Sequence, residues 1–219
     1  MKKFFLALVL PAILLSGCKV NEHYNNITLD KYKLDMQSGD SQKINVLTGD
    51  PDNVLWTSDN PYAVTVDKGV VSALRVGNAR ITANNASVAV KVSPRSNLYV
   101  EPITDFQWGV SREFVIGTIG IPDKLENNTM RYDLSSAVSS FKIYMFDDNG
   151  RLIAAGITVN RDRTSHLDDF LNERYQLLTD DGEVNKEYIN ALTYANADMS
   201  ISRNAYDSNY WIVTYRSLK

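Results

Sequence analysis

The sequence is poor in the residues that usually carry redox, metal and nucleophilic chemistry. Its 219 residues include one cysteine, Cys18, and two histidines, His23 and His166. One cysteine cannot form a disulfide within the chain, so packed cores must stabilise the folded part. Basic clusters are also missing. Lys2 and Lys3 account for two of the 23 basic residues, which leaves 21 against 26 acidic residues and a net charge near −5. This balance argues against a nucleic-acid partner.

Long hydrophobic runs are absent except at the start of the chain. Two lysines precede an apolar run from Phe4 to Leu15, which Pro11 interrupts, and two small residues follow it. A membrane-spanning helix needs roughly 20 apolar residues, so this run is too short to span. The order of charge, apolar run and small residues is typical of an export signal. Residues 1–17 are therefore predicted to be a signal peptide that is removed after export.

The cysteine directly follows the small residues. Leu15-Ser16-Gly17-Cys18 resembles the lipobox of bacterial lipoproteins, in which the cysteine thiol receives a diacylglycerol and becomes the first residue of the mature chain. The resemblance implies lipidation at Cys18 and therefore a membrane anchor, which two or more acyl chains make stable. An ordinary secretory signal with a chance cysteine is the alternative.

The residues after the cysteine bear on location. Residues 18–26 are polar and lack periodicity, so they are expected to form a tether. Lys19 stands where enterobacterial lipoproteins retained in the inner membrane carry an aspartate. We therefore expect a lipid-anchored protein of the bacterial cell envelope, at the outer membrane, facing either the periplasm or the outside.

Residues 27–94 show short apolar alternations that turn residues interrupt at roughly the spacing of a sandwich. Val88, Val90 and Val92, for example, fall on one face of a strand. Gly69 lies in a turn between two such strands, where it can take the positive φ that a short hairpin loop demands. The pattern predicts an antiparallel β-sandwich.

A family resemblance covers roughly a third of the chain. Residues 56–83 read WTSDNPYAVTVDKGVVSALRVGNARITA. They are similar to the bacterial immunoglobulin-like group 2 family, whose pattern combines a Trp-Ser/Thr-Ser-x-Asn-Pro segment, a Val-x-Val strand, a Gly-Val-Val turn and a Gly-x-Ala-x-Ile-Thr-Ala strand. The resemblance implies that residues 27–94 form an immunoglobulin-like β-sandwich of the kind that serves as a stalk or spacer, without catalytic residues. The bulky ring of Trp56, in a strand-like segment at 54–57, is expected between the two sheets.

A second unit is predicted after a joint at residues 93–97, where a proline and small polar residues end the alternation. Residues 98–219 are predicted to form an α+β domain in two layers, an antiparallel sheet with one or two helices. Strand-like segments at 141–146 and 152–159 flank Asp147-Asp148-Asn149-Gly150, which is typical of a β-hairpin. Ser165 is expected to cap a helix with apolar residues at helical spacing, namely Leu167, Phe170, Leu171, Tyr175 and Leu178.

The order of these segments suggests an internal repeat. Ser111 can cap a helix at 112–119 that precedes three strand-like segments, and the Ser165 helix precedes three more, at 192–195, 198–203 and 210–215. This favours two helix-plus-three-strand units. Because β-branched residues and glycines weaken the first helix, a strand at 112–119 is the alternative. Val100-Glu101-Pro102 and Trp108-Gly109-Val110-Ser111 also resemble domains that follow such immunoglobulin-like modules in envelope lipoproteins of gut Bacteroidetes.

Patterns that could carry catalysis or bind metal are weak. His166, Asp168 and Asp169 do not converge on one helix face, so His166 is interpreted as a surface residue. The acidic turns at 147–150 and 180–183 lack the alternating ligands of a calcium loop, and Ser111 lacks the second glycine of a nucleophile elbow. The sequence therefore predicts no catalytic residue, no metal site and no cofactor.

Aromatic residues crowd the C-terminal part of the chain. In the last strand, Trp211 and Tyr215 point to one side and Tyr210 to the other. One side is expected under the helices, and an exposed opposite side could contact a partner. Tyr206 belongs to the same crowd. The candidate binding residues are Trp108, Tyr194, Tyr210, Trp211 and Tyr215.

Three functional hypotheses follow. The leading hypothesis is a noncatalytic, lipid-anchored envelope protein in which an immunoglobulin-like spacer presents a C-terminal binding domain to a protein or glycan partner. The alternative is a small hydrolase, or an inhibitor of one, that works through the C-terminal sheet. A scaffold within an envelope complex is the third.

Overall fold

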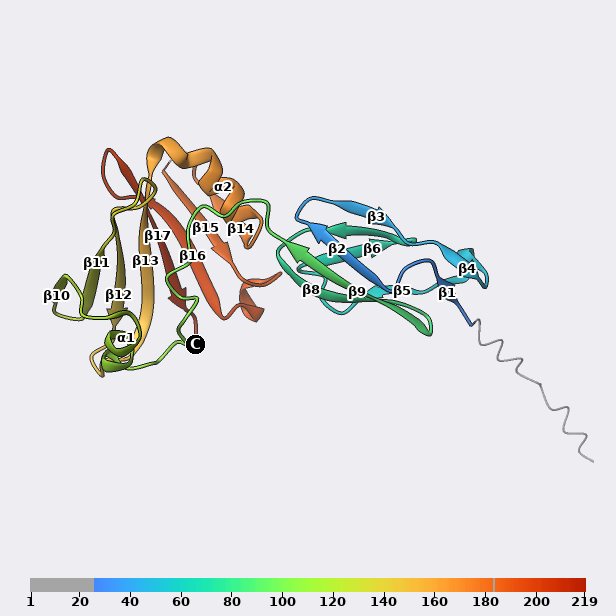
Figure 1. Cartoon of the computed structure of the whole chain (residues 1–219), viewed down its shortest axis with the longest axis horizontal. Coiled ribbons are helices and arrows are strands. Elements are labelled where there is room, and N and C mark those ends of the chain that lie inside the picture. Colours follow the sequence, from blue (N-terminus) through green and yellow to red (C-terminus); the bar gives the residue numbers. More distant parts are fainter. Residues whose placement is uncertain (1–25, 183) are drawn as a thin grey trace, which may run out of the picture.

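The computed structural model describes residues 26–182 and 184–219, which form a mainly β structure with several sheets and two short helices. The predicted signal peptide, Cys18 and residues 18–25 of the predicted tether lie outside the described residues. Within the described ranges, neither helix has the length and hydrophobicity that crossing a membrane requires. Figure 1 shows two units joined end to end, with β1 (Thr28–Leu29) at the end remote from the C-terminal unit.

Two main sheets build the N-terminal unit. The first contains, in spatial order, β2 (Lys33–Gln37), β9 (Ala86–Ser93), β8 (Gly77–Ala83) and β5 (Trp56–Ser58). The second contains β3 (Ser41–Lys43), β7 (Val70–Ala73) and β6 (Val64–Asp67). β1 pairs separately with β4 (Val46–Thr48). The prediction of an all-antiparallel arrangement is wrong for one pair, because β2 runs parallel to β9. These two strands are far apart in the chain and no hairpin connects them.

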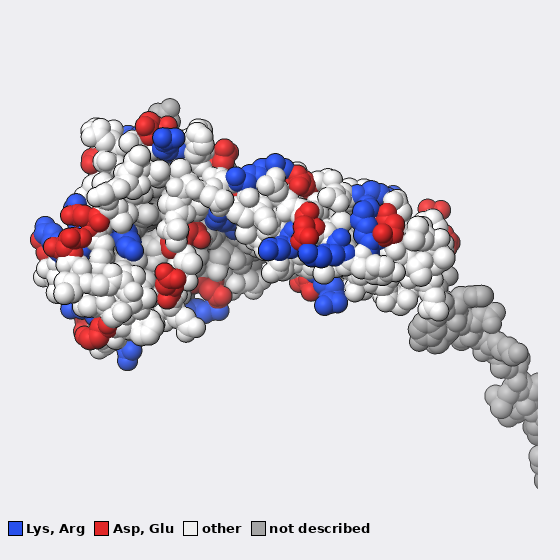
Figure 2. Space-filling model, in the orientation of Figure 1, with Lys and Arg blue, Asp and Glu red and all other residues white. Residues whose placement is uncertain are grey.

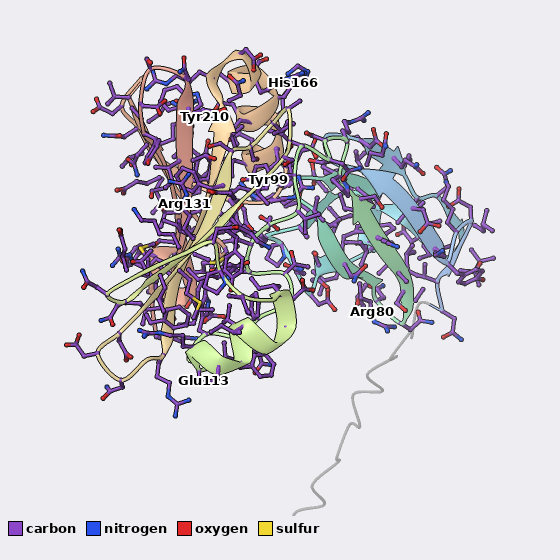
Figure 3. The ribbon with its side chains drawn as sticks, turned by 60° about the vertical axis from the view of Figure 1, so that its left-hand side comes forward. Arg80, Tyr99, Glu113, Arg131, His166 and Tyr210 are labelled. Carbon is purple, nitrogen blue, oxygen red and sulfur yellow. The ribbon has the colours of Figure 1, made fainter. Side chains whose placement is uncertain are left out.

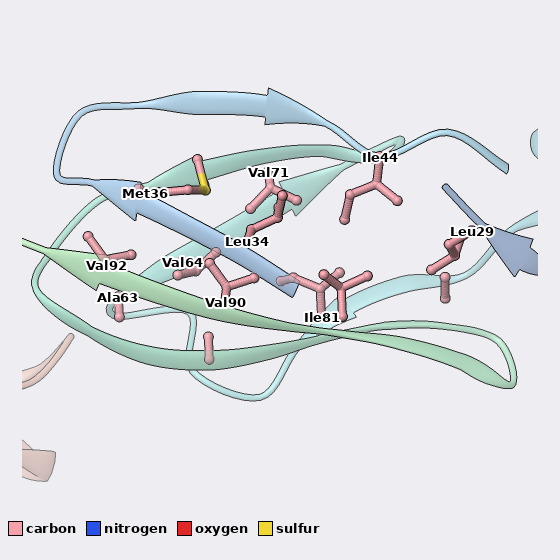
Figure 4. Packing of buried hydrophobic residues seen from close by; sticks show 14 of the residues in the cluster. Leu29, Leu34, Met36, Ile44, Ala63, Val64, Val71, Ile81, Val90 and Val92 are labelled. Carbon is pink, nitrogen blue, oxygen red and sulfur yellow. The ribbon is translucent and has the colours of Figure 1, made fainter. Parts of the chain in front are cut away.

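A hydrophobic cluster from both sheets fills the space between them (Figure 4). Val88, Val90 and Val92 of β9 and Val71 of β7 are at most 2% exposed, so the alternation predicted for β9 is confirmed. Fully burying such a side chain stabilises the fold by roughly 1.5–3 kcal/mol. Trp56 is half-buried and packs against this cluster from its margin, not at its centre.

The turn between β6 and β7 requires its glycine. Lys68 and Gly69 have φ angles of 47° and 78° and connect the cross-strand pair Asp67 and Val70, as in the mirror-image turns that suit hairpins. The carbonyl oxygen of Gly69 accepts the N–H of Ile44 at 2.8 Å. A Cβ on Gly69 would lie 2.7 Å from the carbonyl oxygen of Ile44. Both the backbone conformation and the lack of space therefore exclude a side chain here.

One antiparallel eight-stranded sheet forms the basis of the C-terminal unit. Its spatial order is β10 (Lys124–Glu126), β11 (Thr129–Asp133), β12 (Phe141–Phe146), β13 (Leu152–Asn160), β17 (Tyr210–Ser217), β16 (Met199–Ala205), β15 (Asn185–Ile189) and β14 (Gln176–Asp180). The predicted hairpin is confirmed, because β12 and β13 pair antiparallel. Its turn contains Gly150 at φ +71°.

Each half of this sheet follows a helix. α1 (Arg112–Ile119) precedes β10 to β13, α2 (Thr164–Asn172) precedes β14 to β17, and the halves join through antiparallel pairing of β13 with β17. Ser111 Oγ accepts the N–H of Phe114 at 3.3 Å, which confirms the predicted cap of α1.

The number of strands per unit differs from the prediction of three. Each helix is followed by four strands, and the prediction missed β10, β14 and β15. The edge strands β10 and β14 are largely exposed and show no apolar alternation, so the sequence pattern does not reveal them. Leu192–Ala195, predicted as a strand, instead lies in the connection between β15 and β16, where a 3₁₀ turn covers Tyr194–Asn196.

α2 begins and ends earlier than the apolar spacing predicts. A 3₁₀ turn at 161–163 leads directly into it, so Ser165 lies inside the helix and not at its cap. The helix ends at Asn172. Tyr175 lies beyond it but is buried in the same cluster, whereas Leu178 is an exposed residue of β14. The apolar residues at helical spacing therefore continue from α2 through a bend into the start of β14.

Both helices and the segment 98–110 cover the same face of the eight-stranded sheet. Figure 3 shows the sheet from the side, with the labelled Glu113 of α1, Tyr99 of the segment and His166 of α2 apart from Arg131 and Tyr210. The ring of Tyr99 lies 4.4 Å from that of Phe170, between centroids. The opposite face, which carries Arg131 and Tyr210, has no helix on it in the described part of the chain.

Side chains of the N-terminal unit hold the edge of the C-terminal unit. Tyr62 Oη donates to the carbonyl oxygen of Arg174 at 2.7 Å and lies 3.2 Å from that of Ile189. Burial of this hydroxyl raises the pKa of Tyr62 to about 12. Arg75 Nη2 donates to Gln176 Oε1 at 2.6 Å, and burial lowers the pKa of Arg75. These contacts fix β14 against the loops of the sandwich.

Glu173, just after α2, completes the joint. Its Oε2 accepts the backbone N–H of Arg95 at 2.8 Å and that of Ser96 at 3.1 Å. Its carbonyl oxygen accepts the N–H of Val76 at 2.8 Å. One residue therefore binds both the connecting segment and a loop of the sandwich, so the two units are held in a fixed relation and not merely linked by a chain.

Candidate functional site

The face of the eight-stranded sheet that lies opposite the helices, here called the open face, is the candidate site. The strand register places rows of its side chains directly beside one another. One row crosses seven strands and mixes charged, apolar, small and hydroxyl-bearing residues. It contains Lys124, Arg131, Ile143, Gly156, Thr214, Ser202 and Glu187.

The centre of the open face is lined by small residues. Ala154, Gly156 and Thr158 of β13 all lie on this side, since alternate residues of a strand share a face, and they are buried between larger side chains of the neighbouring segments. A Cβ on Gly156 would lie 3.1 Å from Cγ1 of Ile143, so Ile143 already occupies the space that a larger residue would need. The larger side chains of this face therefore lie toward β11 and β12.

Two of the five predicted binding residues are buried and cannot contact a ligand. Trp211 is 5% exposed and lies between the guanidinium groups of Arg161 and Arg203, at 4.2 and 4.3 Å from the ring centroid. Tyr215 is fully buried, and its hydroxyl lies 2.8 Å from that of Tyr99. The prediction that one side of this strand lies under the helices is correct, and it places Trp211 and Tyr215 in the core.

The other three predicted binding residues lie apart from one another. Trp108 is half-buried and packs against both hydrophobic clusters on the covered face. Tyr194 is exposed in the connection between β15 and β16. Tyr210 is half-buried and belongs to the open face. The five aromatic residues therefore do not form a common patch, and only Tyr210 lies on the open face.

Arg203 forms a buried ion cluster on the covered face. It is 1% exposed, and its Nη1 lies 2.7 Å from Asp168 Oδ1. Lys186 Nζ lies 3.0 Å from Asp168 Oδ2. The carboxylate of Asp168 thus pairs with two cations beneath α2, whereas His166 is exposed on the helix. Asp168 and His166 do not act as a pair, which agrees with the interpretation of His166 as a surface residue.

Tyrosine hydroxyls on the covered face hold the segment 98–110. Tyr175 Oη donates to Glu101, and Tyr144 Oη donates to the carbonyl oxygen of Pro102 at 3.0 Å. Burial raises the pKa of both Tyr175 and Tyr144 well above the usual range. Burial also lowers the pKa of Lys142. These hydroxyls serve the fold, because they satisfy polar groups of a segment that crosses the sheet.

A hollow with a volume of about 830 Å³ lies at the joint. Its charged walls already have partners, because Arg95 pairs with Asp40 and Glu173 accepts two backbone N–H groups. His166 and Asp169 line its other side. The hollow is therefore a crevice between two docked units whose charges hold those units together.

The acidic turns satisfy their own backbone. Asp147 Oδ1 accepts the N–H groups of Asn149 and Arg151 at 2.9 and 2.8 Å, and Asp180 Oδ1 accepts that of Gly182 at 3.0 Å. Among the described residues, no group of three or more His, Cys, Asp or Glu side chains could hold a metal ion. Figure 2 shows charges of both signs interspersed over the visible face.

Comparison of the chain with protein-family models and with curated proteins gives no match. The resemblance of residues 27–94 to the bacterial immunoglobulin-like group 2 family therefore stays a prediction. Arg131 is not among the predicted binding residues, although it alternates with the buried Met130 and Tyr132 in β11. That alternation places Arg131 on the open face once the strand is known.

Proposed function

We propose that the chain is a noncatalytic, lipid-anchored protein of the bacterial cell envelope, at the outer membrane. In this proposal an immunoglobulin-like sandwich is the spacer, and the C-terminal unit binds a protein or glycan partner through its open face. The observation that carries the proposal is the one-sided cover of the eight-stranded sheet: two helices and the segment 98–110 lie on one face. The opposite face presents Ile143, Ile212 and Tyr210 with hydroxyl side chains.

The order of the units supports a spacer role. β1, the first strand described, lies at the end of the sandwich remote from the eight-stranded sheet (Figure 1). An anchor at Cys18 would precede this end, so the sandwich would stand between the membrane and the open face. The contacts of Tyr62, Arg75 and Glu173 would keep the open face at a set angle to the sandwich.

The anchor is tested by the full chain carrying Cys18→Ala. We expect the natural chain to stay with membranes through a high-salt and alkaline wash, because two or more acyl chains on Cys18 anchor it stably. The variant has no thiol to carry the lipid and should be released. Ser16→Ala keeps a small residue in the lipobox-like segment and should remain attached. Mass spectrometry of the mature chain should find lipid on Cys18, and an unmodified thiol there would remove the anchor from the proposal.

The open face is tested by crosslinking in intact cells. Thr214 lies in the middle row of this face, and Thr57 is an exposed strand residue of the sandwich. A photoreactive residue at position 214 should form adducts with an envelope protein or glycan, and one at position 57 should not. Equal adduct yields at the two positions would contradict binding through the open face. Glycan or peptide turnover that one carboxylate substitution abolishes would replace the proposal with a hydrolase.

A further inference from the structure

A hollow of about 260 Å³ lies on the open face beside the free edge of the sheet. Its floor is apolar and consists of Phe141, Ile143 and Ile212. Its rim carries charged and hydroxyl-bearing side chains from β10 and β11, and Tyr206 from the connection between β16 and β17. An apolar floor beneath a few convergent polar groups is the usual composition of a small-ligand site.

The charged residues that line this hollow, Lys124, Glu126 and Arg131, take part in two ion pairs. Lys124 Nζ lies 2.7 Å from Glu126 Oε1, and Arg131 Nε lies 2.7 Å from Asp133 Oδ1. All four side chains are more than a third exposed. Exposed pairs of this kind contribute little to stability. Because their side chains are exposed, their donors and acceptors are accessible to a ligand. An ionic ligand would have to displace one partner of a pair, whereas a neutral ligand could use both signs.

Tyr206 offers a fixed aromatic surface. Tyr206 is 49% exposed, and its ring meets the ring of Phe141 edge to face, with centroids 5.3 Å apart. Asp207 Oδ1 accepts the N–H groups of Asn209 and Tyr210 at 2.7 and 2.8 Å, which holds the loop. A ring that is already held in place loses little conformational freedom when a ligand stacks on it.

Arg131 offers a pair of terminal donors beside the Phe141 ring. Its guanidinium lies 4.1 Å from the centroid of the Phe141 ring, and Asp133 holds it through Nε. Neither terminal nitrogen of Arg131 donates a hydrogen bond to another residue of the described ranges. The planar guanidinium therefore presents two parallel N–H groups, which suit two neighbouring oxygens of a ligand.

We infer that this hollow binds a neutral saccharide, with one sugar ring stacked on Tyr206. The C–H face of a pyranose is apolar and fits an aromatic ring, and its adjacent hydroxyls can accept from Arg131 and Lys124 and donate to Glu126. The hollow has room for a single ring at the free edge of the sheet, so the rest of a glycan can extend past β10. This inference rests on the proposed function and names the class of ligand for its open face.

The test uses arrayed neutral hexose oligosaccharides, their uronic-acid counterparts and free peptides as probes of the mature chain without its anchor, followed by titration calorimetry. We expect a neutral oligosaccharide to bind more tightly than its uronic-acid counterpart. Tyr206→Ala should weaken that binding about tenfold, the scale of one aromatic contact. Arg131→Lys should weaken it similarly, because an ammonium cannot present two parallel donors. Tyr194→Ala removes another exposed ring and should leave binding unchanged.

Three results would overturn the inference: tighter binding of the uronic acid, selective binding of peptides, or unchanged affinity in both Tyr206→Ala and Arg131→Lys. Each of these leaves the crosslinking result at position 214 intact. Loss of the saccharide site and loss of the open face as a binding surface are therefore separate outcomes.

Discussion

Arg203→Ala is expected to lower the free energy of unfolding of the C-terminal unit by about 3–5 kcal/mol, the range for breaking a buried ion pair. Arg203 is the largest fully buried side chain among the described residues. Its loss removes one of the two cations that pair with Asp168 and opens a cavity beside Trp211. Urea unfolding in a Trp56→Phe background measures the effect, because the two remaining tryptophans, at positions 108 and 211, belong to this unit.

Arg216→Ala is the matched control for this variant. Arg216 lies on the neighbouring strand of the same sheet but is exposed, so its loss should change the free energy of unfolding by no more than about 0.5 kcal/mol. Arg203→Met, which retains most of the buried volume, should recover part of the stability lost in Arg203→Ala. A loss below about 1 kcal/mol in Arg203→Ala would show that the cluster beneath α2 is not held as described.

Gly69→Ala is expected to destabilise the sandwich by about 3 kcal/mol, the upper end for a side chain in a left-handed conformation. The alanine backbone would have to adopt φ near +78°, and its Cβ would lie 2.7 Å from the carbonyl oxygen of Ile44. Because this oxygen is part of the backbone, relief requires β3 to move away from β7. Trp56 lies next to the turn and is the one tryptophan of residues 27–94, so its fluorescence in a Trp108→Phe, Trp211→Phe background follows the unfolding of the sandwich.

Gly150→Ala separates the two causes. Gly150 has φ +71° in its hairpin turn, and a Cβ there would meet nothing within 4 Å. Only the backbone conformation opposes the methyl group, and the expected loss is about 1 kcal/mol, measured for the C-terminal unit. Equal losses in Gly69→Ala and Gly150→Ala would mean that the contact with Ile44 contributes nothing.

Local pattern predicted those parts of the fold that local chemistry determines. The alternation in β9, the turn at Gly69, the hairpin around Gly150 and the Ser111 cap of α1 are all confirmed. In each case, a period-two pattern, a positive φ or a side-chain cap acts within a few residues. The start and end of α2 were not predicted correctly, because a 3₁₀ turn and a bend continue its helical spacing.

The site depends on contacts between distant segments, which local pattern does not reveal. Arg131 and Phe141 meet through the pairing of β11 with β12, and Tyr206 reaches Phe141 from a loop more than sixty positions later. Composition singled out the aromatic residues of the last strand. The register then placed Trp211 and Tyr215 in the core and Tyr210 on the open face. Which side of that strand the helices cover follows from tertiary packing.

The hydrogen bonds of Glu173 to both the connecting segment and the Val76 loop affect how the two units can move relative to each other. Free rotation at this joint would let the eight-stranded sheet change its orientation relative to the sandwich. The hydrogen bonds of Glu173 oppose such rotation, so a tilt of the sandwich would also change the direction in which the open face points.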